Sequence, residues 1–221
     1  AANGDKELVS EAVKAGADVN RERGVNTALE VAVNNNHYPV AQYLLSVGAK
    51  AENIQSTDDK TKLMILGAEN GDKEMVSEAV KAGAEVNEKR DGKTALELAE
   101  ANKHFEVCQY LIDNGAIVPS SVDINIINLF TAANTGDSQL CQEAIEAGAV
   151  VNTRNSDGET ALEIATKRFH YPVAQLLISH GAKLEDLKDA KEKTNLLIFG
   201  AENGDRKSTR LNSSHSSVSR M

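Results

Sequence analysis

The feature that most constrains the fold is a Gly-Ala pair that returns about every 33 residues. Its glycines are Gly16, Gly48, Gly83, Gly115, Gly148 and Gly181. The gaps between them are 32, 35, 32, 33 and 33 residues. A fixed period of this length is typical of stacked-repeat proteins, in which each unit packs only on its neighbours. About residues 1–204 are therefore predicted to form one elongated array.

Two kinds of repeat alternate along the chain. In every second repeat, a Thr-Ala-Leu-Glu motif follows the glycine by 11 or 12 residues, at Thr27, Thr94 and Thr160. The other repeats carry apolar runs instead, such as Leu63–Leu66. A Gly-Asp pair recurs only once per two repeats, and its glycines are Gly4, Gly71, Gly136 and Gly204. The duplicated unit is therefore interpreted as a pair of repeats.

These motifs resemble the ankyrin repeat family over about residues 1–204. That family carries Thr-Pro-Leu-His-x-Ala on its first helix and Gly-Ala-Asp-Val-Asn after its second. Here alanine replaces the proline and glutamate replaces the histidine, as at Ala28 and Glu30. The resemblance implies an all-α solenoid of helix-turn-helix repeats with short β-turn fingers. We expect about six repeats in pairs, truncated at both ends.

Several polar residues have predicted local roles. Asp5 and Thr27 should cap the starts of helices, and Gly16 should supply the left-handed residue that ends one. Asn20, Asn87 and Asn152 are expected to bond their own local turns. Glu30, Glu97 and Glu163 are expected to accept backbone N–H groups from a neighbouring finger. His37, His104 and His170 are expected to cap loops.

The recurring Glu and His residues also invite a catalytic or metal-binding interpretation. Copies two layers apart should lie about 20 Å from each other, because packed helices are about 10 Å apart. Metal–ligand bonds are only about 2 Å long, so the copies could not share an ion. The sequence contains no Gly-rich phosphate loop and no paired-cysteine motif. We therefore expect no enzyme activity, cofactor or metal.

The net charge and the cysteine content limit which classes of partner and which cellular compartment are expected. The net charge of −9 argues against nucleic-acid binding, which needs a basic surface. No run of 18 apolar residues is present, so we expect no membrane span. Cys108 and Cys141 hold matching places in adjacent repeats, too far apart for a disulfide. Reduced thiols favour the cytoplasm or nucleus.

The ends of the chain are expected to be unusual. The chain begins with Ala1, so an N-terminal part is expected to be missing, with residues 1–3 ending a first helix. Residues 205–221 resemble translated sequencing-adapter read-through and are interpreted as a non-native disordered tail. Two longer charged fingers, Ala51–Thr61 and Lys183–Lys193, should project furthest. Fraying is expected over residues 183–204, where an incomplete repeat would expose its apolar face.

The predicted function is a protein-protein interaction scaffold that binds a partner on its concave finger and first-helix surface, as the resemblance implies. A basic surface on that partner would suit the acidic chain, and we expect a monomer. Two alternatives remain open: the regulatory or targeting array of a larger enzyme or channel, and a structural spacer. The candidate contact residues are Arg23, Asn26, Asn34, Asn35, Glu69, Asn70, Arg90, Asp91, Lys93, Asn102, Asn134, Thr135, Ser156, Asp157, Glu159, Lys167 and Arg168.

Overall fold

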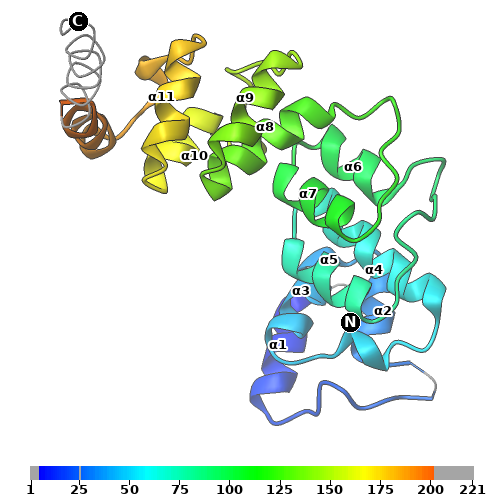
Figure 1. Cartoon of the computed structure of the whole chain (residues 1–221). Coiled ribbons are helices and arrows are strands. Elements are labelled where there is room, and N and C mark those ends of the chain that lie inside the picture. Colours follow the sequence, from blue (N-terminus) through cyan, green and yellow to red (C-terminus); the bar gives the residue numbers. More distant parts are fainter. Residues whose placement is uncertain (1–4, 25, 202–221) are drawn as a thin grey trace, which may run out of the picture. The chain divides into compact units, whose positions relative to one another are not determined.

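The computed structural model describes residues 5–24 and 26–201 (Figure 1). Within these residues the regular structure is helical, and the only β structure is three isolated bridges in loops. This confirms the predicted all-α class with short β-turn fingers. The predicted array end at residue 204, the first-helix end at residues 1–3 and the tail 205–221 lie outside the described residues. The chain divides into two compact units, residues 1–127 and 128–221.

The first unit consists of helix pairs that follow one another along the chain. Its elements are α1 (Lys6–Lys14), α2 (Ala28–Asn34), α3 (Tyr38–Ser46), η1 (Ala51–Asn53), α4 (Thr57–Asn70), α5 (Lys73–Lys81), α6 (Ala95–Ala101) and α7 (Phe105–Asp113). The first helices α2, α4 and α6 pack on one another in order. The second helices α3, α5 and α7 each pack on the first helix that precedes them. We use "first helix" and "second helix" in this sense throughout.

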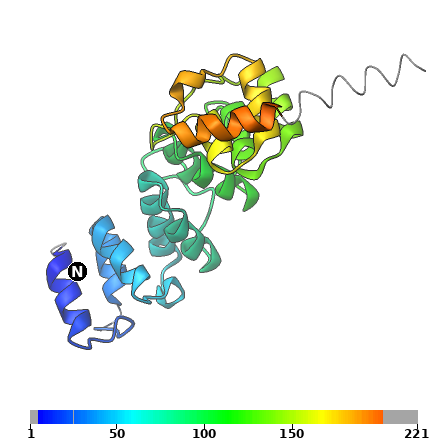
Figure 2. The same cartoon turned by 90° about the vertical axis from the view of Figure 1, so that its left-hand side faces the viewer.

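The second unit repeats the same plan. The first helix α8 (Ile124–Thr135) begins in the first unit and continues in the second. It is followed by α9 (Ser138–Glu146), α10 (Ala161–Lys167), α11 (Tyr171–Ser179), η2 (Leu184–Asp186) and a helical stretch over residues 190–201. α10 packs on α11, and α11 packs on α9 (Figures 1 and 2).

A Thr–Glu capping box starts three of the first helices, as the predicted Thr caps require. The Thr27 hydroxyl accepts the Glu30 N–H at 3.2 Å, and a Glu30 carboxylate oxygen accepts the Thr27 N–H at 2.7 Å. The same box stands at Thr94 and Thr160. These helices have only seven residues, so satisfying N–H groups at the first turn matters to each.

The glutamates of these boxes were predicted to bond a neighbouring finger, and the structure corrects this in part. Each accepts the backbone N–H of its own cap residue. Glu30 also accepts the N–H of Gln55 in the next finger at 3.0 Å, as predicted. Glu97 instead accepts the Ser121 hydroxyl at 3.3 Å. A carboxylate has two oxygens, so one can complete the box while the other reaches forward.

The asparagines after the Gly-Ala pairs were predicted to bond their own turns, which is wrong. The Asn87 amide donates to the Gly115 carbonyl at 3.0 Å and accepts the Ile117 N–H at 2.8 Å. Asn20 and Asn152 bond the residues around Gly48 and Gly181 in the same way. Each side-chain amide therefore bonds the next repeat at a carbonyl and at an N–H that lie two residues apart. Neighbouring β-strands bond each other's backbone in the same way.

The histidines were predicted to cap loops, and this too needs correction. His104 stands at a helix start but makes no side-chain cap bond. Its Nε2 lies 3.2 Å from the carbonyl oxygen of Glu69, near the end of α4, which is the first helix of the previous repeat. A carbonyl oxygen only accepts, so this nitrogen carries the proton. His170 lies equally far from the Asn134 carbonyl oxygen. His104 and His170 therefore link consecutive repeats.

The two long fingers are shorter than predicted. α4 already begins at Thr57, because the Ser56 hydroxyl caps it by accepting the Asp59 N–H at 3.4 Å. Before it, residues 51–53 form the one-turn helix η1, and Ile54 is 1% exposed. The second long finger likewise contains η2 and the buried Leu187. The buried apolar residue in each loop packs against the repeats and so keeps the loop close to them.

The core is a series of thin layers between helix pairs. Its largest fully buried side chains include Leu29, Leu44, Leu63, Met64, Met75, Leu96, Leu111, Leu129, Leu162 and Leu177. Small buried alanines lie between them and let the helices approach closely. Cys108 and Cys141 are free and buried on the second helices α7 and α9. Burial raises the pKa of Cys108 to about 12 and that of Cys141 to about 11.

Candidate protein-binding surface

The predicted contact surface consists of the fingers and the exposed side of the first helices. The finger of residues 90–93 is a tight hairpin in which Arg90 and Lys93 exchange two backbone hydrogen bonds of 2.9 Å. Its central residues Asp91 and Gly92 both have positive φ, 49° and 81°. This is the type I′ turn that Asp-Gly sequences favour. It leaves Asp91 and Lys93 exposed at the tip.

The other fingers are built differently. In the first, the Arg23 N–H donates to the Asn26 carbonyl at 3.0 Å. In the finger before α10, the Asn155 side chain accepts the N–H groups of Asp157 and Glu159 at 3.1 and 2.8 Å. Side-chain bonds to nearby backbone of this kind keep a loop in one conformation. The finger before α10 is therefore held in shape before any partner arrives.

Most of the predicted contact residues are exposed. The exposed ones are Arg23, Asn26, Asn34, Asn35, Glu69, Asn70, Asp91, Lys93, Asn102, Thr135, Ser156, Asp157, Lys167 and Arg168. Arg90, Asn134 and Glu159 are partly buried. The predicted contact residues come from several fingers and helices. They are distributed along the fingers and the ends of first helices in both units.

Four of these residues already bond the ends of their own helices. The side-chain amides of Asn35, Asn70 and Asn102 donate to carbonyls four residues earlier at 2.7, 2.8 and 3.1 Å. The Thr135 hydroxyl donates in the same way at 2.9 Å. These bonds satisfy carbonyls that a helix end otherwise leaves to water. The four side chains thus have a structural role in addition to any contact role.

A polar cluster joins three consecutive repeats of the first unit. Lys62 on α4 contacts Asp58 at 2.9 Å, Asp59 at 2.7 Å and the Asn34 side-chain oxygen of α2 at 2.8 Å. Arg90 of the following finger pairs with Asp58. We call Asn34, Asp58, Asp59, Lys62 and Arg90 the first-helix cluster. It links side chains of α2, α4 and the 90–93 finger.

Sequence reasoning missed three members of this cluster. Asp58, Asp59 and Lys62 were not among the predicted contact residues, because their segment was taken for finger and not for helix. The Ser-x-x-Asp pattern of Ser56 and Asp59 was the available signal, since Ser followed by acidic residues commonly starts a helix. With the helix start known, positions 58, 59 and 62 fall within one turn.

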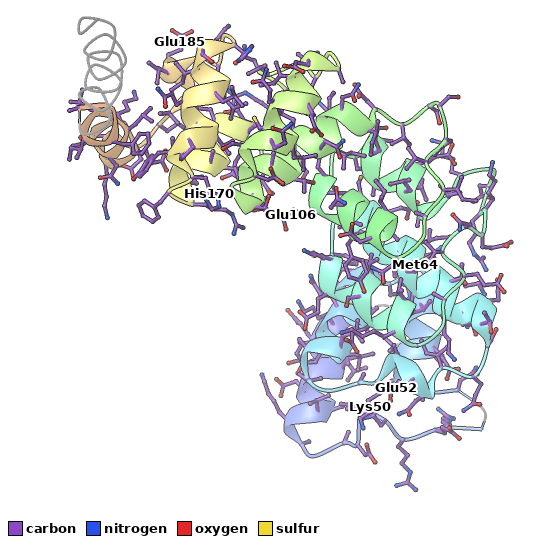
Figure 3. All side chains as sticks on the ribbon, in the orientation of Figure 1. Lys50, Glu52, Met64, Glu106, His170 and Glu185 are labelled. Atoms are coloured by element: carbon purple, nitrogen blue, oxygen red, sulfur yellow. The ribbon has the colours of Figure 1, made fainter. Side chains whose placement is uncertain are left out.

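The second unit has a separate group of ion pairs. Arg154 lies 3.3 Å from a carboxylate oxygen of Glu163 and 2.7 Å from one of Asp186. Lys167 pairs with Glu159, and this bond raises the pKa of Lys167. Partial burial raises the pKa of the nearby Glu192 carboxyl, while Lys167 opposes the rise. In Figure 3, Glu185 lies at the finger end of this unit and His170 at the opposite end.

Two negative findings concern residues 5–24 and 26–201. No three His, Cys, Asp or Glu side chains among them are grouped so as to hold a metal ion. None of the helices in this part of the chain has the length and apolar content needed to cross a membrane.

Comparison with known proteins places this architecture in context. A family model for ankyrin repeats in three copies matches residues 47–126 and 129–211, and a single-repeat model matches residues 26–59. "Probable 26S proteasome regulatory subunit p28" of Saccharomyces cerevisiae is 38% identical over 101 residues, which are 45% of this chain and 44% of that protein. "Ankyrin repeat and KH domain-containing protein mask-1" of Caenorhabditis elegans is 29% identical over 161 residues, 72% of this chain and 6% of that protein.

A solved structure, the human ASB11 ankyrin repeat domain, is 20% identical with a TM-score of 0.32, covering 89% of this chain and 94% of that one. The chain spans less than half the length of either of the two sequence relatives.

Proposed function

Because the chain belongs to the ankyrin repeat family, we propose that it is a non-enzymatic scaffold that binds another protein through its fingers and first helices. The observation that carries this proposal is the first-helix cluster, which links side chains of three consecutive repeats of the first unit. The exposed candidate contact residues Asn34, Asp91 and Lys93 lie in or next to it.

The proposed mechanism is the display of a surface that is ordered before binding. Association costs free energy when loops and side chains must become ordered, and a prearranged surface avoids much of that cost. The hairpin at Asp91 and Gly92 and the Asn155 turn bring this order to the fingers. The chain carries a net charge of −9, which would attract a partner with a basic surface and speed the encounter.

The test compares charge reversals on two sides of the first unit. Arg23→Glu and Lys93→Glu change exposed finger residues, whereas Lys73→Glu makes the same charge change on the exposed side of the second helix α5. The full chain and each variant would be used to capture partners from a cell extract, with circular dichroism as the folding control. We expect the finger variants to lose a captured protein at least tenfold and Lys73→Glu to retain it. Equal capture by all variants, or equal loss, would contradict the proposal.

A second candidate is that the chain is the binding array of a longer protein and regulates or targets its other domains. The observation that favours it is that the matching region makes up only 6% of the mask-1 relative. Sequencing the source transcript across both ends tests it. A catalytic or channel domain in the same reading frame would support this candidate. Repeats alone, bounded by a start and a stop codon, would leave the scaffold standing by itself.

A further inference from the structure

The turn between α10 and α11 carries Phe169, which is unusual in both its backbone and its side chain. Its φ is 63°, in the left-handed region, where a Cβ atom crowds the following carbonyl oxygen. Asn and Asp are the residues other than glycine that adopt this conformation most readily, and a bulky side chain there is rare. The Phe169 side chain is also 62% exposed, so its burial offsets little of the backbone strain.

The corresponding turns show that the strained backbone belongs to the repeat, whereas the aromatic ring does not. Five turns join a first helix to a second helix within the described residues, and each has a residue with positive φ at this position: Asn36, Gly71, Lys103, Gly136 and Phe169. Asn36 and Lys103 are exposed although helices of other repeats precede and follow them in the chain. Exposure at this position is therefore a property of the turn.

The ring of Phe169 is held in one orientation by its neighbour. Its centroid lies 6.1 Å from that of Tyr171, and the two planes are inclined by 73°, the edge-to-face arrangement that aromatic pairs favour. Tyr171 in turn stacks on Phe199, with centroids 4.9 Å apart. An exposed ring whose orientation is already set loses little conformational freedom when another molecule packs on it.

The residue before Phe169 adds a positive charge to this exposed ring. Arg168 is exposed, and the other four turns carry at its position uncharged side chains that bond their own helices, Asn35, Asn70, Asn102 and Thr135. A guanidinium group can bind a carboxylate through two parallel hydrogen bonds. Aromatic residues and Arg are enriched in protein interfaces, so this pair of neighbours has the composition of a contact site.

We propose that Phe169 and Arg168 form a second binding site on this chain, for a short segment of another protein that carries an apolar side chain next to a carboxylate. The apolar side chain packs on the Phe169 ring, and the carboxylate pairs with Arg168. Arg168 is among the contact residues predicted from the sequence, whereas Phe169 is not.

This site is distinct from the fingers. Phe169 directly precedes His170, which lies at the opposite end of the second unit from Glu185 in its finger (Figure 3). The site also prefers the opposite charge, because the fingers were proposed to bind a basic surface and Arg168 selects an acidic segment. The inference therefore goes beyond the proposed function and does not depend on it.

A second copy of this chain suits the site less well than a different protein does. A symmetric contact through Phe169 would place Arg168 of one copy near Arg168 of the other, because a two-fold axis brings the same patch together. Like charges across an interface disfavour the contact. The net charge of −9 also makes two copies repel each other.

The first measurement separates binding from a structural role for the ring. Phe169→Asn introduces the residue type that occupies the same turn position at Asn36. Asn tolerates positive φ, so we expect the urea midpoint of this variant to equal or exceed that of the unmodified chain. A clearly lower midpoint would show that the ring stabilises the fold, and the strain would then need no binding partner to explain it.

The second measurement selects ligands for the site. Short random peptides displayed on phage are selected on the full chain, with soluble Phe169→Asn chain as a competitor that removes peptides bound elsewhere. We expect the enriched peptides to share an apolar side chain next to Asp or Glu. Fluorescence anisotropy of the labelled synthetic peptides then measures Kd. Phe169→Asn and Arg168→Glu should each weaken binding at least about tenfold.

Two matched variants control for these changes. Lys103→Asn makes the same replacement in the equivalent turn of the first unit, and Lys183→Glu reverses an exposed charge at the finger end of the second unit. Both should leave the Kd within about twofold of that of the unmodified chain. The finger variants Arg23→Glu and Lys93→Glu should also leave it unchanged, so failure of this proposal and failure of the proposed function can be told apart.

Four outcomes would overturn the proposal. They are a selection that enriches no peptide, enriched peptides without acidic residues, equal binding by the unmodified and Phe169→Asn chains, and equal weakening by Arg168→Glu and Lys183→Glu. Sedimentation velocity addresses the second copy as an alternative occupant. Self-association of the unmodified chain that Phe169→Asn abolishes would assign this site to another copy and so overturn the proposal as well.

Discussion

At the scale of single residues, the asparagines after the Gly-Ala pairs show where sequence reasoning reaches its limit. The residue type predicted a side chain that bonds backbone, which is correct. The type cannot say which backbone, because the amide reaches a local turn and a neighbouring repeat equally well. Only stacking brings Gly115 and Ile117 to Asn87, which lies 28 and 30 residues earlier in the chain.

Replacing one of these asparagines should weaken the array measurably. Asn87→Ala removes two inter-repeat hydrogen bonds, and we expect the free energy of unfolding to fall by about 1–2 kcal/mol. Urea unfolding measures this. Asn35→Ala is the matched control, because that side chain bonds only its own helix, to the Val31 carbonyl. Equal losses in the two variants would show that the link between repeats adds nothing.

The side chain of His104 imposes a steric requirement on Gly71, for which Gly83 provides a comparison. Gly71 and Gly83 both have positive φ, 72° and 99°, so alanine at either position costs about 1–2 kcal/mol of backbone strain. A Cβ atom on Gly71 would also lie 2.4 Å from Nδ1 of His104, whereas one on Gly83 meets nothing within 4 Å. We therefore expect Gly71→Ala to lower the free energy of unfolding by about 1–3 kcal/mol more than Gly83→Ala does.

Thermal or urea unfolding of both glycine variants checks this difference. Adding His104→Ala to Gly71→Ala should recover part of the loss, because the clash disappears with the ring. If the two single variants lose the same stability, the ring does not press on Gly71.

At the scale of elements, the helix starts could be predicted well and the contacts between elements could not. Thr27, Thr94 and Thr160 were placed as caps because a hydroxyl before an apolar helical run has a local function. The partners of Glu97 and His104 depend on how neighbouring repeats stack, which leaves no local signal. The start of α4 was predicted too late because the Ser56 cap was overlooked.

The reactivity of Cys108 and Cys141 reports whether the second helices α7 and α9 open to solvent. Burial raises the pKa of the Cys108 thiol to about 12 and that of Cys141 to about 11, so almost no thiolate exists at pH 8. We expect both thiols to react with a thiol reagent far more slowly in the native chain than in urea. Prompt reaction at pH 8 without denaturant would show that these helices open readily.

The same raised pKa values predict that the free energy of unfolding decreases at alkaline pH. The unfolded thiol has a pKa near 9, so the contribution of buried neutral thiols is fully present below pH 9. It is lost as the pH rises towards 12, because the unfolded state ionises first. Cys108→Ala should therefore reduce the loss of stability in this alkaline range.

At the scale of the whole molecule, each repeat contacts only its neighbours, so stability should vary along the chain. The face of the 190–201 helix that carries Leu197 and Ile198 is uncovered, whereas α4 is covered on the same side. We expect the amides of residues 190–201 to exchange with deuterium at nearly their unprotected rate, and those of α4 much more slowly. Mass spectrometry of exchanged peptides measures both. Equal protection in the two helices would contradict this expectation of fraying.

The order of the repeats could be predicted from the sequence because the repeat period is visible in it. The candidate surface could be predicted only by position, because its residues are ordinary polar side chains. Asn70 and Asn102 were placed on the exposed side correctly, yet both cap their own helices. Because these residues recur for structural reasons, the sequence pattern alone does not show which of them would also contact a partner.

The asparagine links also bear on how such a protein can change in length over evolutionary time. Each amide bonds backbone atoms that every copy of the next repeat supplies, here around Gly48, Gly115 and Gly181. Unequal recombination between gene copies that adds or removes one repeat pair would recreate the same bonds at the new junction. Such a protein can therefore become longer or shorter by one repeat pair in a single genetic event, with no compensating substitution elsewhere.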